Sequence, residues 1–313
     1  MSESSRSILV IRGGAIGDFL LTLPALRLLR EGFPDCRIEI VGYRHICSVA
    51  EGRFYADAVR SIEYAPMAGF FNPRSDLDPE LSAYFASFGQ VICYLFDPDG
   101  FFEGNLRRCG VKNLICGDPR ISDSRHAVHQ LASPLESLAL FLEDSSVEIF
   151  PSEEDAAEAE RLLAGCRMPL VAVHPGSGSS KKNWPLPAWE ELLSQLCDTK
   201  ASILVVSGES DVERVAGLKE AFGSRLVFLD HLPLHILGAV LQRCSFFIGH
   251  DSGISHLAAA AGTECLLLFG PTDPAVWAPA NPDVNVLRAP GGLLHNLPVE
   301  VVRSHLPDFL TPQ

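Results

Sequence analysis

Two glycine-rich loops, each beside a charged residue, are the parts of this sequence best suited to chemistry. The first reads R-G-G-A-I-G-D, so that Gly13, Gly14 and Gly17 precede a single carboxylate, Asp18. Glycine allows tight turns and close approach of the backbone to a ligand. Asp18 has two open interpretations. It caps the N-terminus of the following helix, or it is a general base that takes a proton from a bound hydroxyl.

The same loop argues against a nicotinamide cofactor. A dinucleotide fingerprint needs G-x-G-x-x-G, whereas this loop has G-G-x-x-G. Asp18 would also lie where the pyrophosphate binds, and two negative charges there repel each other. We therefore expect no bound cofactor at this loop.

The second loop, H-P-G-S-G-S-S-K-K-N-W-P, has the composition of an oxyanion site. Ser177 and its neighbours offer hydroxyl and N–H donors, and Lys181 and Lys182 add positive charge. In a chain of net charge −14, a diphosphate is the natural partner of this lysine pair. The Walker pattern G-x-x-x-x-G-K-[ST] is absent. A flexible, solvated loop is the alternative.

A third loop, G-H-D-S-G-I-S-H-L, joins an apolar run to an alanine-rich helix. Ser252 and Gly253 would place free N–H groups at the helix N-terminus, where anions bind. Asp251 could accept hydrogen bonds from sugar or ribose hydroxyls. His256 could donate to a phosphate, or it is a packed structural histidine.

Asp97-Pro98-Asp99 is a D-x-D motif that follows an apolar run and could bind a divalent metal. Pro98 and Gly100 are typical turn residues, so we interpret the motif as a turn. We expect no bound metal.

Short apolar runs that alternate with helical patterns must position these loops. Buried runs of this kind predict parallel sheets with helices on both faces. In the first half we expect strands at Ser7–Arg12, Cys36–Gly42, Val91–Phe96 and Lys112–Cys116, and helices at Gly17–Glu31 and Pro79–Phe88. In the second half we expect strands at Leu170–His174, Ala201–Ser207, Arg225–Leu229, Ser245–Gly249 and Cys265–Phe269. We expect helices there at Pro187–Cys197, Val212–Phe222, Leu234–Arg243 and Gly253–Ala261.

The acidic segment Glu143–Glu154 separates the two alternating stretches and predicts a linker, followed by a helix that begins near Glu153. We therefore expect two domains, 1–150 and 151–313, each a doubly wound α/β sheet. A final amphipathic helix over 299–310 is expected to pack back toward the first domain. Ligands in such sheets bind at the carboxyl ends of the strands, which predicts an active site in a cleft between the domains.

Composition and net charge argue against some classes of binding partner. The chain has 313 residues, of which 47% are hydrophobic and 20% charged, as in globular proteins. A net charge of −14 argues against nucleic acid. Nine scattered cysteines without a C-x-x-C pair predict reduced thiols in the cytoplasm. No signal peptide or membrane span is expected.

Four pieces together resemble the family 9 glycosyltransferases, whose best-known members are ADP-heptose:lipopolysaccharide heptosyltransferases. The similar pieces are Ile8–Leu26, Val173–Pro185, Gly249–Ala261 and Phe269–Pro274. The resemblance implies the GT-B fold, two Rossmann-like domains facing across a cleft, and inverting transfer without a metal. It implies a nucleotide-diphosphate sugar as donor and a glycan, such as lipopolysaccharide core, as acceptor. A lipid-linked acceptor implies peripheral contact with the inner membrane face.

The resemblance also assigns roles to individual residues. It makes Asp18 the catalytic base and Lys182 the diphosphate ligand. It places Asp251, Ser252, Gly253 and His256 in the donor loop. An acidic residue in G-E-S-D-V-E, for which we favour Glu213, would hold the ribose.

The acceptor half, 42–150, shows no matching motif. Its scattered candidates for binding an anionic acceptor are Arg44, Arg53, Arg60, Arg107 and Arg108. Two other functions stay open: a sugar-nucleotide epimerase of the same fold, and a non-catalytic protein that binds nucleotide sugars.

Overall fold

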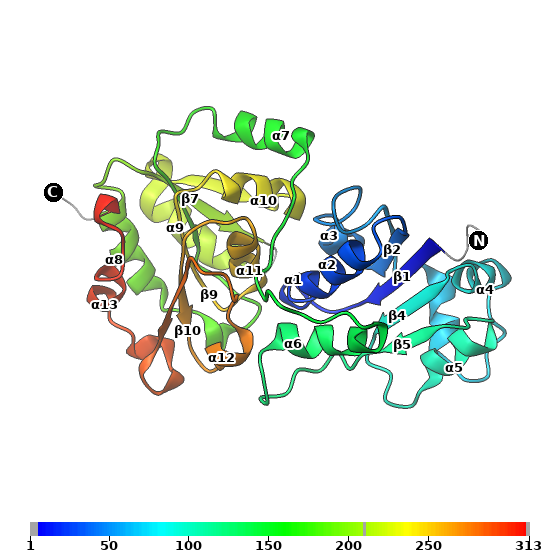
Figure 1. The fold of residues 1–313 in the computed structure, drawn as a ribbon. Coiled ribbons are helices and arrows are strands. Elements are labelled where there is room, and N and C mark those ends of the chain that lie inside the picture. The colour runs from blue at the N-terminus through cyan, green and yellow to red at the C-terminus, as the bar shows by residue number, and fades with distance from the viewer. Residues whose placement is uncertain (1–5, 209–210, 311–313) are drawn as a thin grey trace. The chain divides into compact units, whose positions relative to one another are not determined.

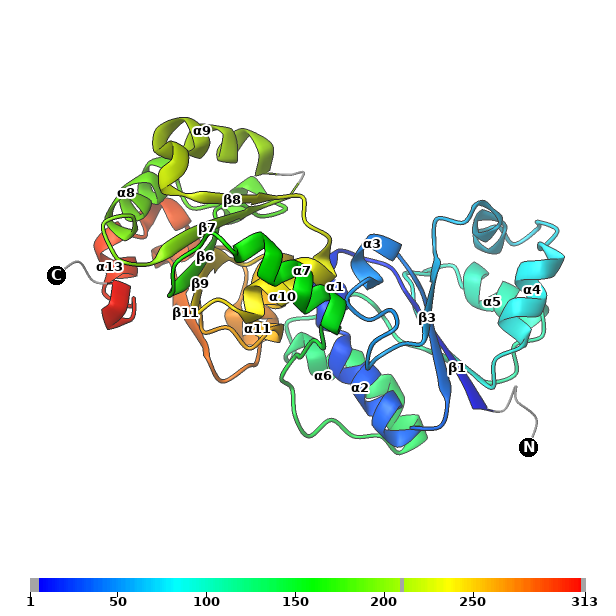
Figure 2. The same cartoon turned by 90° about the horizontal axis from the view of Figure 1, so that it is seen from above.

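The computed structural model describes residues 6–208 and 211–310. The chain divides into two compact units, Met1–Ser145 and Ser146–Gln313. Each unit contains one parallel sheet with helices on both faces, as Figures 1 and 2 show. The expected α/β class is therefore confirmed.

The first unit is built on a five-stranded sheet in the order β3-β2-β1-β4-β5. Every strand pair is parallel, and the central strand β1 pairs Ser7 with Arg37 of β2 and Ile8 with Gln90 of β4. The strands are β1 (Ser7–Arg12), β2 (Arg37–Gly42), β3 (Ala58–Ser61), β4 (Gln90–Tyr94) and β5 (Leu114–Cys116). The helices are α1 (Ile16–Leu20), α2 (Leu23–Gly32), α3 (Arg44–Cys47), α4 (Pro79–Ala86), α5 (Phe101–Arg108) and α6 (Ala127–Ala132).

One face of this sheet carries an aromatic core. Phe85 of α4 and Phe102 of α5 pack with Phe70 against the side chains that β1 and β4 present on that face. Aromatic rings bury large apolar areas, and tilted or edge-on contacts suit their charge distribution. This core holds the carboxyl ends of β1 and β4 in place.

The expected helix over Gly17–Glu31 is wrong in one respect, because it is two helices. Helix α1 ends at Leu20 and α2 begins at Leu23. Pro24 has no N–H and would clash with the carbonyl four residues earlier, so a continuous helix cannot form. The Thr22 hydroxyl at the break donates to the Asp18 carbonyl oxygen (2.7 Å) and partly satisfies it.

The second unit is built on a six-stranded parallel sheet in the order β11-β10-β9-β6-β7-β8. The strands are β6 (Leu170–His174), β7 (Ser202–Ser207), β8 (Val227–Asp230), β9 (Phe246–His250), β10 (Cys265–Phe269) and β11 (Val284–Arg288). The helices are α7 (Glu153–Leu163), α8 (Leu186–Leu196), α9 (Val212–Phe222), α10 (Leu234–Gln242), α11 (Gly253–Ala260), α12 (Pro274–Trp277) and α13 (Val299–Arg303). Helices α8 and α9 cover one face and α7, α10 and α11 the other (Figure 2).

Helix α8 shows how the sequence directs this packing. Trp189, Leu192, Leu193 and Leu196 recur at helical spacing, and all four are buried against the sheet. Such a stripe follows from 3.6 residues per turn. At the start of the unit, Ser152 and Asp155 form a capping box that fixes the first turn of α7.

The expected helix over 299–310 is also wrong. Helix α13 ends at Arg303, and a separate 3-10 turn follows at Asp308–Leu310. Pro307 disfavours helical backbone at the preceding residue, which ends the helix early. Val302 and Leu310 are buried in the core of the second unit, whereas Phe309 is 42% exposed.

Candidate functional site

The loop after β1 holds Asp18 in a fixed orientation. Asp18 Oδ2 accepts a hydrogen bond from the Ala15 backbone N–H (2.9 Å). Gly14 has a φ of 98°, and a Cβ there would lie 2.8 Å from Asp18 Oδ2. Only glycine therefore suits this position. Within the described residues Asp18 Oδ1 has no hydrogen-bond partner, so one oxygen caps the turn and the other remains available.

Arg12 stabilises the same loop through hydrogen bonds. The sequence analysis did not single out this residue. Its guanidinium is buried, and Nε donates to Thr22 Oγ1 (3.0 Å) while Nη2 donates to the Asp18 carbonyl oxygen (3.1 Å). Nη1 contacts the carbonyl oxygen of Tyr94 on β4 (3.4 Å). Burial lowers the pKa of Arg12, and the nearby Asp18 carboxylate opposes that effect. Arg12 thereby ties the ends of β1, α1 and β4 together.

A pocket of about 520 Å³ opens at the carboxyl ends of the first sheet. Its polar lining includes Arg12, Asp18, Tyr43 and Glu63, and Gly13 and Gly14 form part of its wall. Gly17 lies outside the lining, and its carbonyl accepts a helical hydrogen bond from the Leu21 N–H. The pocket has the size and mixed lining of a small-ligand site.

The scattered arginines proposed for an anionic acceptor are already engaged. Arg44, Arg60 and Arg107 pair with glutamates, at 3.2, 3.5 and 2.8 Å respectively. Arg53 and Arg108 donate to backbone carbonyl oxygens. None of these five arginines lines the pocket beside Asp18.

In the second unit, three strand-end loops meet at a buried carboxylate. Lys182 Nζ lies 2.7 Å from Asp251 Oδ2, and the Thr272 hydroxyl donates to the same oxygen (2.6 Å). The Asp251 side chain is 7% exposed and that of Lys182 is 30% exposed. The loops after β6, β9 and β10 each contribute one of these residues. The arrangement keeps one ammonium group at the carboxyl edge of the sheet, partly open to solvent.

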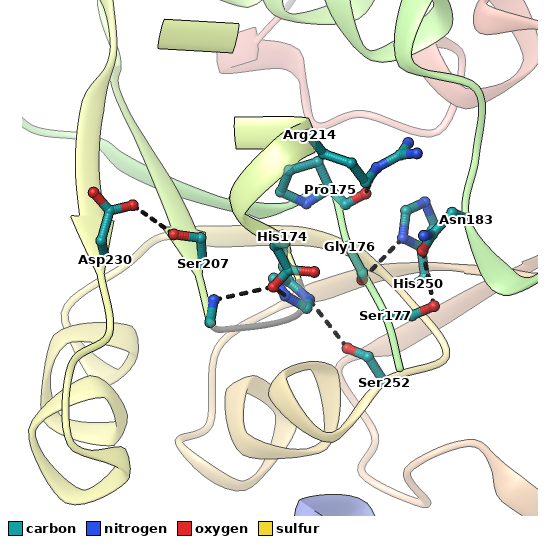
Figure 3. Close-up of polar contacts among 12 residues, drawn as sticks. His174, Pro175, Gly176, Ser177, Asn183, Ser207, Arg214, Asp230, His250 and Ser252 are labelled. Carbon is teal, nitrogen blue, oxygen red and sulfur yellow. Dashed lines mark hydrogen bonds and ion pairs between the residues drawn. The ribbon is translucent and has the colours of Figure 1, made fainter. Parts of the chain in front are cut away.

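Ser177 closes the first of these loops upon itself. Its hydroxyl oxygen lies 2.8 Å from both Asn183 Oδ1 and the Ser179 carbonyl oxygen, and the side chain is nearly buried. Figure 3 shows Ser177 and Asn183 pointing toward each other. In this structure Ser177 shapes the loop, whereas the neighbouring Gly178 is exposed.

Ser252 and Gly253 form the predicted N-terminus of α11. The Ser252 side chain accepts from the Ser255 N–H, and Gly253 is the first helical residue. His256 follows in the first turn but is only 3% exposed, so its side chain lies inside the unit. The structure therefore brings Ser252 and Gly253 to the helix N-terminus as predicted, and the role expected for the buried His256 stays a prediction.

A buried histidine that the sequence analysis passed over links three strand ends. His174 Nε2 lies 3.1 Å from Asp211 Oδ2. His174 Nδ1 lies 3.2 Å from Ser252 Oγ (Figure 3). Asp211 Oδ2 also accepts from the Gly208 N–H (3.0 Å). The network joins the ends of β6 and β9 to the loop after β7.

His250, also missed, holds the glycine-rich loop against the sheet. Its Nε2 accepts from the Trp184 backbone N–H (2.9 Å) and the Trp189 indole N–H (3.3 Å). Its Nδ1 therefore carries the proton and donates to the Gly176 carbonyl oxygen (3.2 Å) (Figure 3). Complete burial lowers the pKa of His250 to about 3, so the ring is neutral at pH 7. Trp184 and Trp189 are buried in the core of the second unit.

The expected ribose-binding segment is only partly described. Glu209 and Ser210 lie outside the described residues. Glu213 is exposed in the first turn of α9. Nearby at the strand ends, Ser207 Oγ donates to Asp230 Oδ1, and Lys219 Nζ pairs with Asp230 Oδ2. The burial that raises the Asp230 pKa is outweighed by these two contacts, which lower it.

Asp97 forms hydrogen bonds within the turn that was predicted for the D-x-D motif. The Gly100 N–H donates to the Asp97 carbonyl oxygen (3.1 Å), and Asp97 Oδ2 accepts from the Glu103 N–H in α5 (2.8 Å). Gly100 has a φ of 68°. Among the residues with described positions, no group of three or more His, Cys, Asp or Glu side chains could hold a metal ion.

Comparisons with known proteins agree with this fold. The chain has a TM-score of 0.80 with the glycosyl transferase family 9 structure from Veillonella parvula, at 20% identity, covering 99% of this chain and 98% of that one. With E. coli heptosyltransferase WaaC with ADP the TM-score is 0.71, at 22% identity, covering 95% and 98%. The fold is the GT-B fold, two parallel-sheet α/β domains in tandem.

The sequence then gives the family. Residues 120–298 match glycosyltransferase family 9 (heptosyltransferase), and the chain belongs to that family. Lipopolysaccharide heptosyltransferase 1 of Escherichia coli O18:K1:H7 is 32% identical over 126 residues, or 40% of this chain. That alignment spans 38% of the length of the relative. Within the described part of the chain, no helix is long and apolar enough to cross a membrane.

Proposed function

We propose that the chain is an inverting glycosyltransferase that moves heptose from ADP-heptose to a lipopolysaccharide-core or related glycan acceptor. Family membership supports the transferase class, and the relatives named for heptosyl transfer support the sugar. The observation that carries the proposal is the Lys182–Asp251–Thr272 cluster at the carboxyl edge of the second sheet. It supplies a fixed cation where an α/β sheet binds phosphate groups.

Lys182 and the backbone N–H groups after β6 and β9 would stabilise the charge that develops on the leaving diphosphate. Such preorganised donors act on the transition state more than on the ground state. Asp251 keeps the Lys182 ammonium in place before the donor arrives. When the diphosphate binds, Lys182 would share its three N–H donors between Asp251 and a phosphate oxygen.

Asp18 would take the proton of the acceptor hydroxyl as that oxygen attacks the anomeric carbon in line with the leaving diphosphate. The bond to the diphosphate breaks on the opposite face, which inverts the configuration. Oδ1 is the atom available for this proton, because Oδ2 is already bonded to the Ala15 N–H. Domain closure would align the two substrates and exclude water that would hydrolyse the donor.

The proposal includes transfer without a bound metal and a role for Glu213, or another acidic residue after β7, at the ribose. It places the reaction in the cytoplasm, with peripheral contact at the inner membrane face for a lipid-linked acceptor. Unchanged turnover in excess EDTA is the expected result. Loss of turnover that Mg²⁺ restores would contradict metal independence.

ADP release from ADP-heptose, measured with and without acceptor, separates the three candidate functions. A transferase releases ADP quickly only when acceptor is present, and the product sugar bond has inverted configuration. An epimerase releases nucleotide without acceptor. A binding protein shows a calorimetric signal for ADP-heptose and no turnover, which would refute the proposal.

A further inference from the structure

Two cysteines face each other across the edge of the first sheet. Cys93 of β4 and Cys116 of β5 are register partners in a parallel pair, and β5 is the outer strand. Side chains of register partners project from the same face. Neighbouring strands lie about 4.8 Å apart, which falls within the Cα separation of about 4.4–6.8 Å that a disulfide spans. Both residues are free thiols.

The two thiols also line one pocket. A cavity of about 200 Å³ is lined by both cysteines together with Glu103 and Arg120. The two register partners therefore lie beside the same cavity, and Cys116 is exposed.

The environments of the two thiols differ in a way that assigns their roles. Cys116 is exposed, and the neighbouring Cys93 thiol lowers its pKa. Cys93 is 4% exposed, and the neighbouring Cys116 together with burial raises its pKa. By contrast, burial raises the pKa of the Cys109, Cys166 and Cys197 thiols. Oxidation favours accessible thiols with thiolate character, so Cys116 reacts first.

We propose that Cys93 and Cys116 form a reversible dithiol–disulfide site that responds to hydrogen peroxide. The Cys116 thiolate attacks one peroxide oxygen and becomes a sulfenic acid as the second oxygen leaves and is protonated to water. The Cys93 thiol then attacks the Cys116 sulfur, the S–O bond breaks, and a second water leaves. One hydrogen peroxide molecule is reduced and two thiols are oxidised to one disulfide.

The position of this bond connects it with the pocket beside Asp18. Leu95 and Phe96 directly follow β4, Pro119 closely follows β5, and all three line that pocket. Gly117 packs so tightly that a Cβ there would lie 2.6 Å from the Tyr94 ring. A disulfide would lock β5 to β4 and restrict the movement of these walls. This consequence rests on the proposed function, under which the pocket receives the acceptor.

Mass spectrometry tests the site directly. The full-length protein is treated with hydrogen peroxide, denatured, alkylated and digested without reduction. We expect a peptide cross-linked between Cys93 and Cys116, and two fewer alkylated cysteines than the nine of the reduced chain. Dithiothreitol should restore all nine. Over-oxidation of Cys116 without a cross-link, or a cross-link that excludes Cys93, would overturn the proposal.

Variants separate this pair from general thiol oxidation. Cys116→Ser and Cys93→Ser should each abolish the cross-link, and Cys166→Ser, a half-buried cysteine away from the pocket, should not. Peroxide should raise the KM for acceptor and leave ADP affinity unchanged in wild type, with no change of KM in Cys116→Ser. A cross-linked protein with unchanged acceptor KM would overturn the link to the pocket. A protein without transferase activity would refute the proposed function alone, since the cross-link is measured independently.

Discussion

The ion pair of Lys182 with Asp251 has a different role before and after a ligand binds. Without ligand, Lys182 compensates a carboxylate that is almost buried. A buried carboxylate without a partner is costly, so the pair keeps the loops after β6 and β9 together. With a diphosphate present, the same ammonium is the nearest cation for its oxygens. One residue thereby links loop stability to ligand affinity.

We predict that Lys182→Met weakens ADP binding by about ten- to a hundredfold, because a hydrogen bond to a charged group contributes roughly 1.5–3 kcal/mol. Lys181→Met is the matched control. It removes the same charge from the neighbouring residue, whose side chain is exposed. Isothermal titration calorimetry with ADP measures both variants. Equal losses in the two variants would show that only the net charge of the loop matters.

His250 makes a pH-dependent contribution to stability. The pKa of His250 is about 3 in the folded protein and 6.5 in a model peptide. Between these two pH values the unfolded chain binds a proton at this histidine, and the folded chain does not. The stabilisation is fully present above about pH 6.5 and is lost as the pH falls toward 3, at up to about 1.4 kcal/mol per pH unit.

His250→Gln should keep an acceptor near Trp184 and remove this proton uptake. We expect its urea midpoint to fall less steeply than that of wild type between about pH 6.5 and pH 4. His305→Gln replaces an exposed histidine and should leave the wild-type slope unchanged. Equal slopes in wild type and His250→Gln would contradict the neutral, buried state.

At the scale of elements, hydrophobic periodicity predicted the central strands well. The bounds of β1, β6, β10 and α9 agree with the expected ranges. Strands β3 and β11 were missed because edge strands bury little. Their sequences, A-V-R-S and V-N-V-L-R, include just one buried side chain, Val59. Two helices were predicted too long, because the apolar pattern continues past Pro24 and Pro307. At these prolines the backbone cannot continue a regular helix.

The residues of the candidate site also divide into those that the sequence indicated and those that it did not. Asp18, Lys182, Asp251 and Ser252 could be singled out as candidates because each follows a strand in a segment of recognisable composition. His250 and Arg12 could not, since their partners are distant in sequence: His250 bonds to residues near 176 and 184, and Arg12 to the end of β4. A sequence pattern indicates candidate binding residues in loops more readily than the buried groups that hold those loops in place.

Two glycines in the loop after β6 test how closely this loop packs against Asp211. A Cβ on Gly176 would lie 1.7 Å from Asp211 Oδ1, whereas one on Gly178 would have open space. We expect Gly176→Ala to destabilise the protein by about 1–3 kcal/mol through overpacking. It should also weaken ADP binding, because Asp211 must move and His174 with it. Gly178→Ala should change neither property.

Differential scanning calorimetry and ADP titration measure both glycine variants. A loss of about 2–12 °C in Tm is expected for Gly176→Ala alone. If the two variants lose the same Tm, or if Gly176→Ala keeps wild-type stability, the close contact between the loop and Asp211 is refuted.

At the scale of the whole molecule, each unit has its own sheet and core. The second unit begins at Ser146, and Val147 and Ile149 bond within it, to Asn281 and the Ala260 carbonyl oxygen. The proposed diphosphate cluster lies wholly in this unit. The pocket beside Asp18 lies wholly in the first. Binding of the nucleotide should therefore be separable from the transfer step.

We predict that a fragment of residues 146–313 folds and binds ADP with a Kd within about tenfold of the full chain, a difference of 1.4 kcal/mol or less. The fragment 1–145 should not bind ADP. Circular dichroism checks that each fragment is folded, and calorimetry measures the affinity. A folded 146–313 fragment without ADP affinity would mean that the first unit supplies part of the nucleotide site.

The central claim is that Asp18 acts on the acceptor while the other unit holds the diphosphate, and Asp18→Asn tests it most directly. The single side-chain oxygen of asparagine can take the place of Asp18 Oδ2 and accept from the Ala15 N–H, so the cap and the fold survive while the base is lost. The acceptor-dependent rate of ADP release at saturating ADP-heptose should fall by about 10²- to 10⁴-fold, with ADP affinity unchanged. A rate within a few-fold of wild type would contradict the account and leave Asp18 as a helix cap.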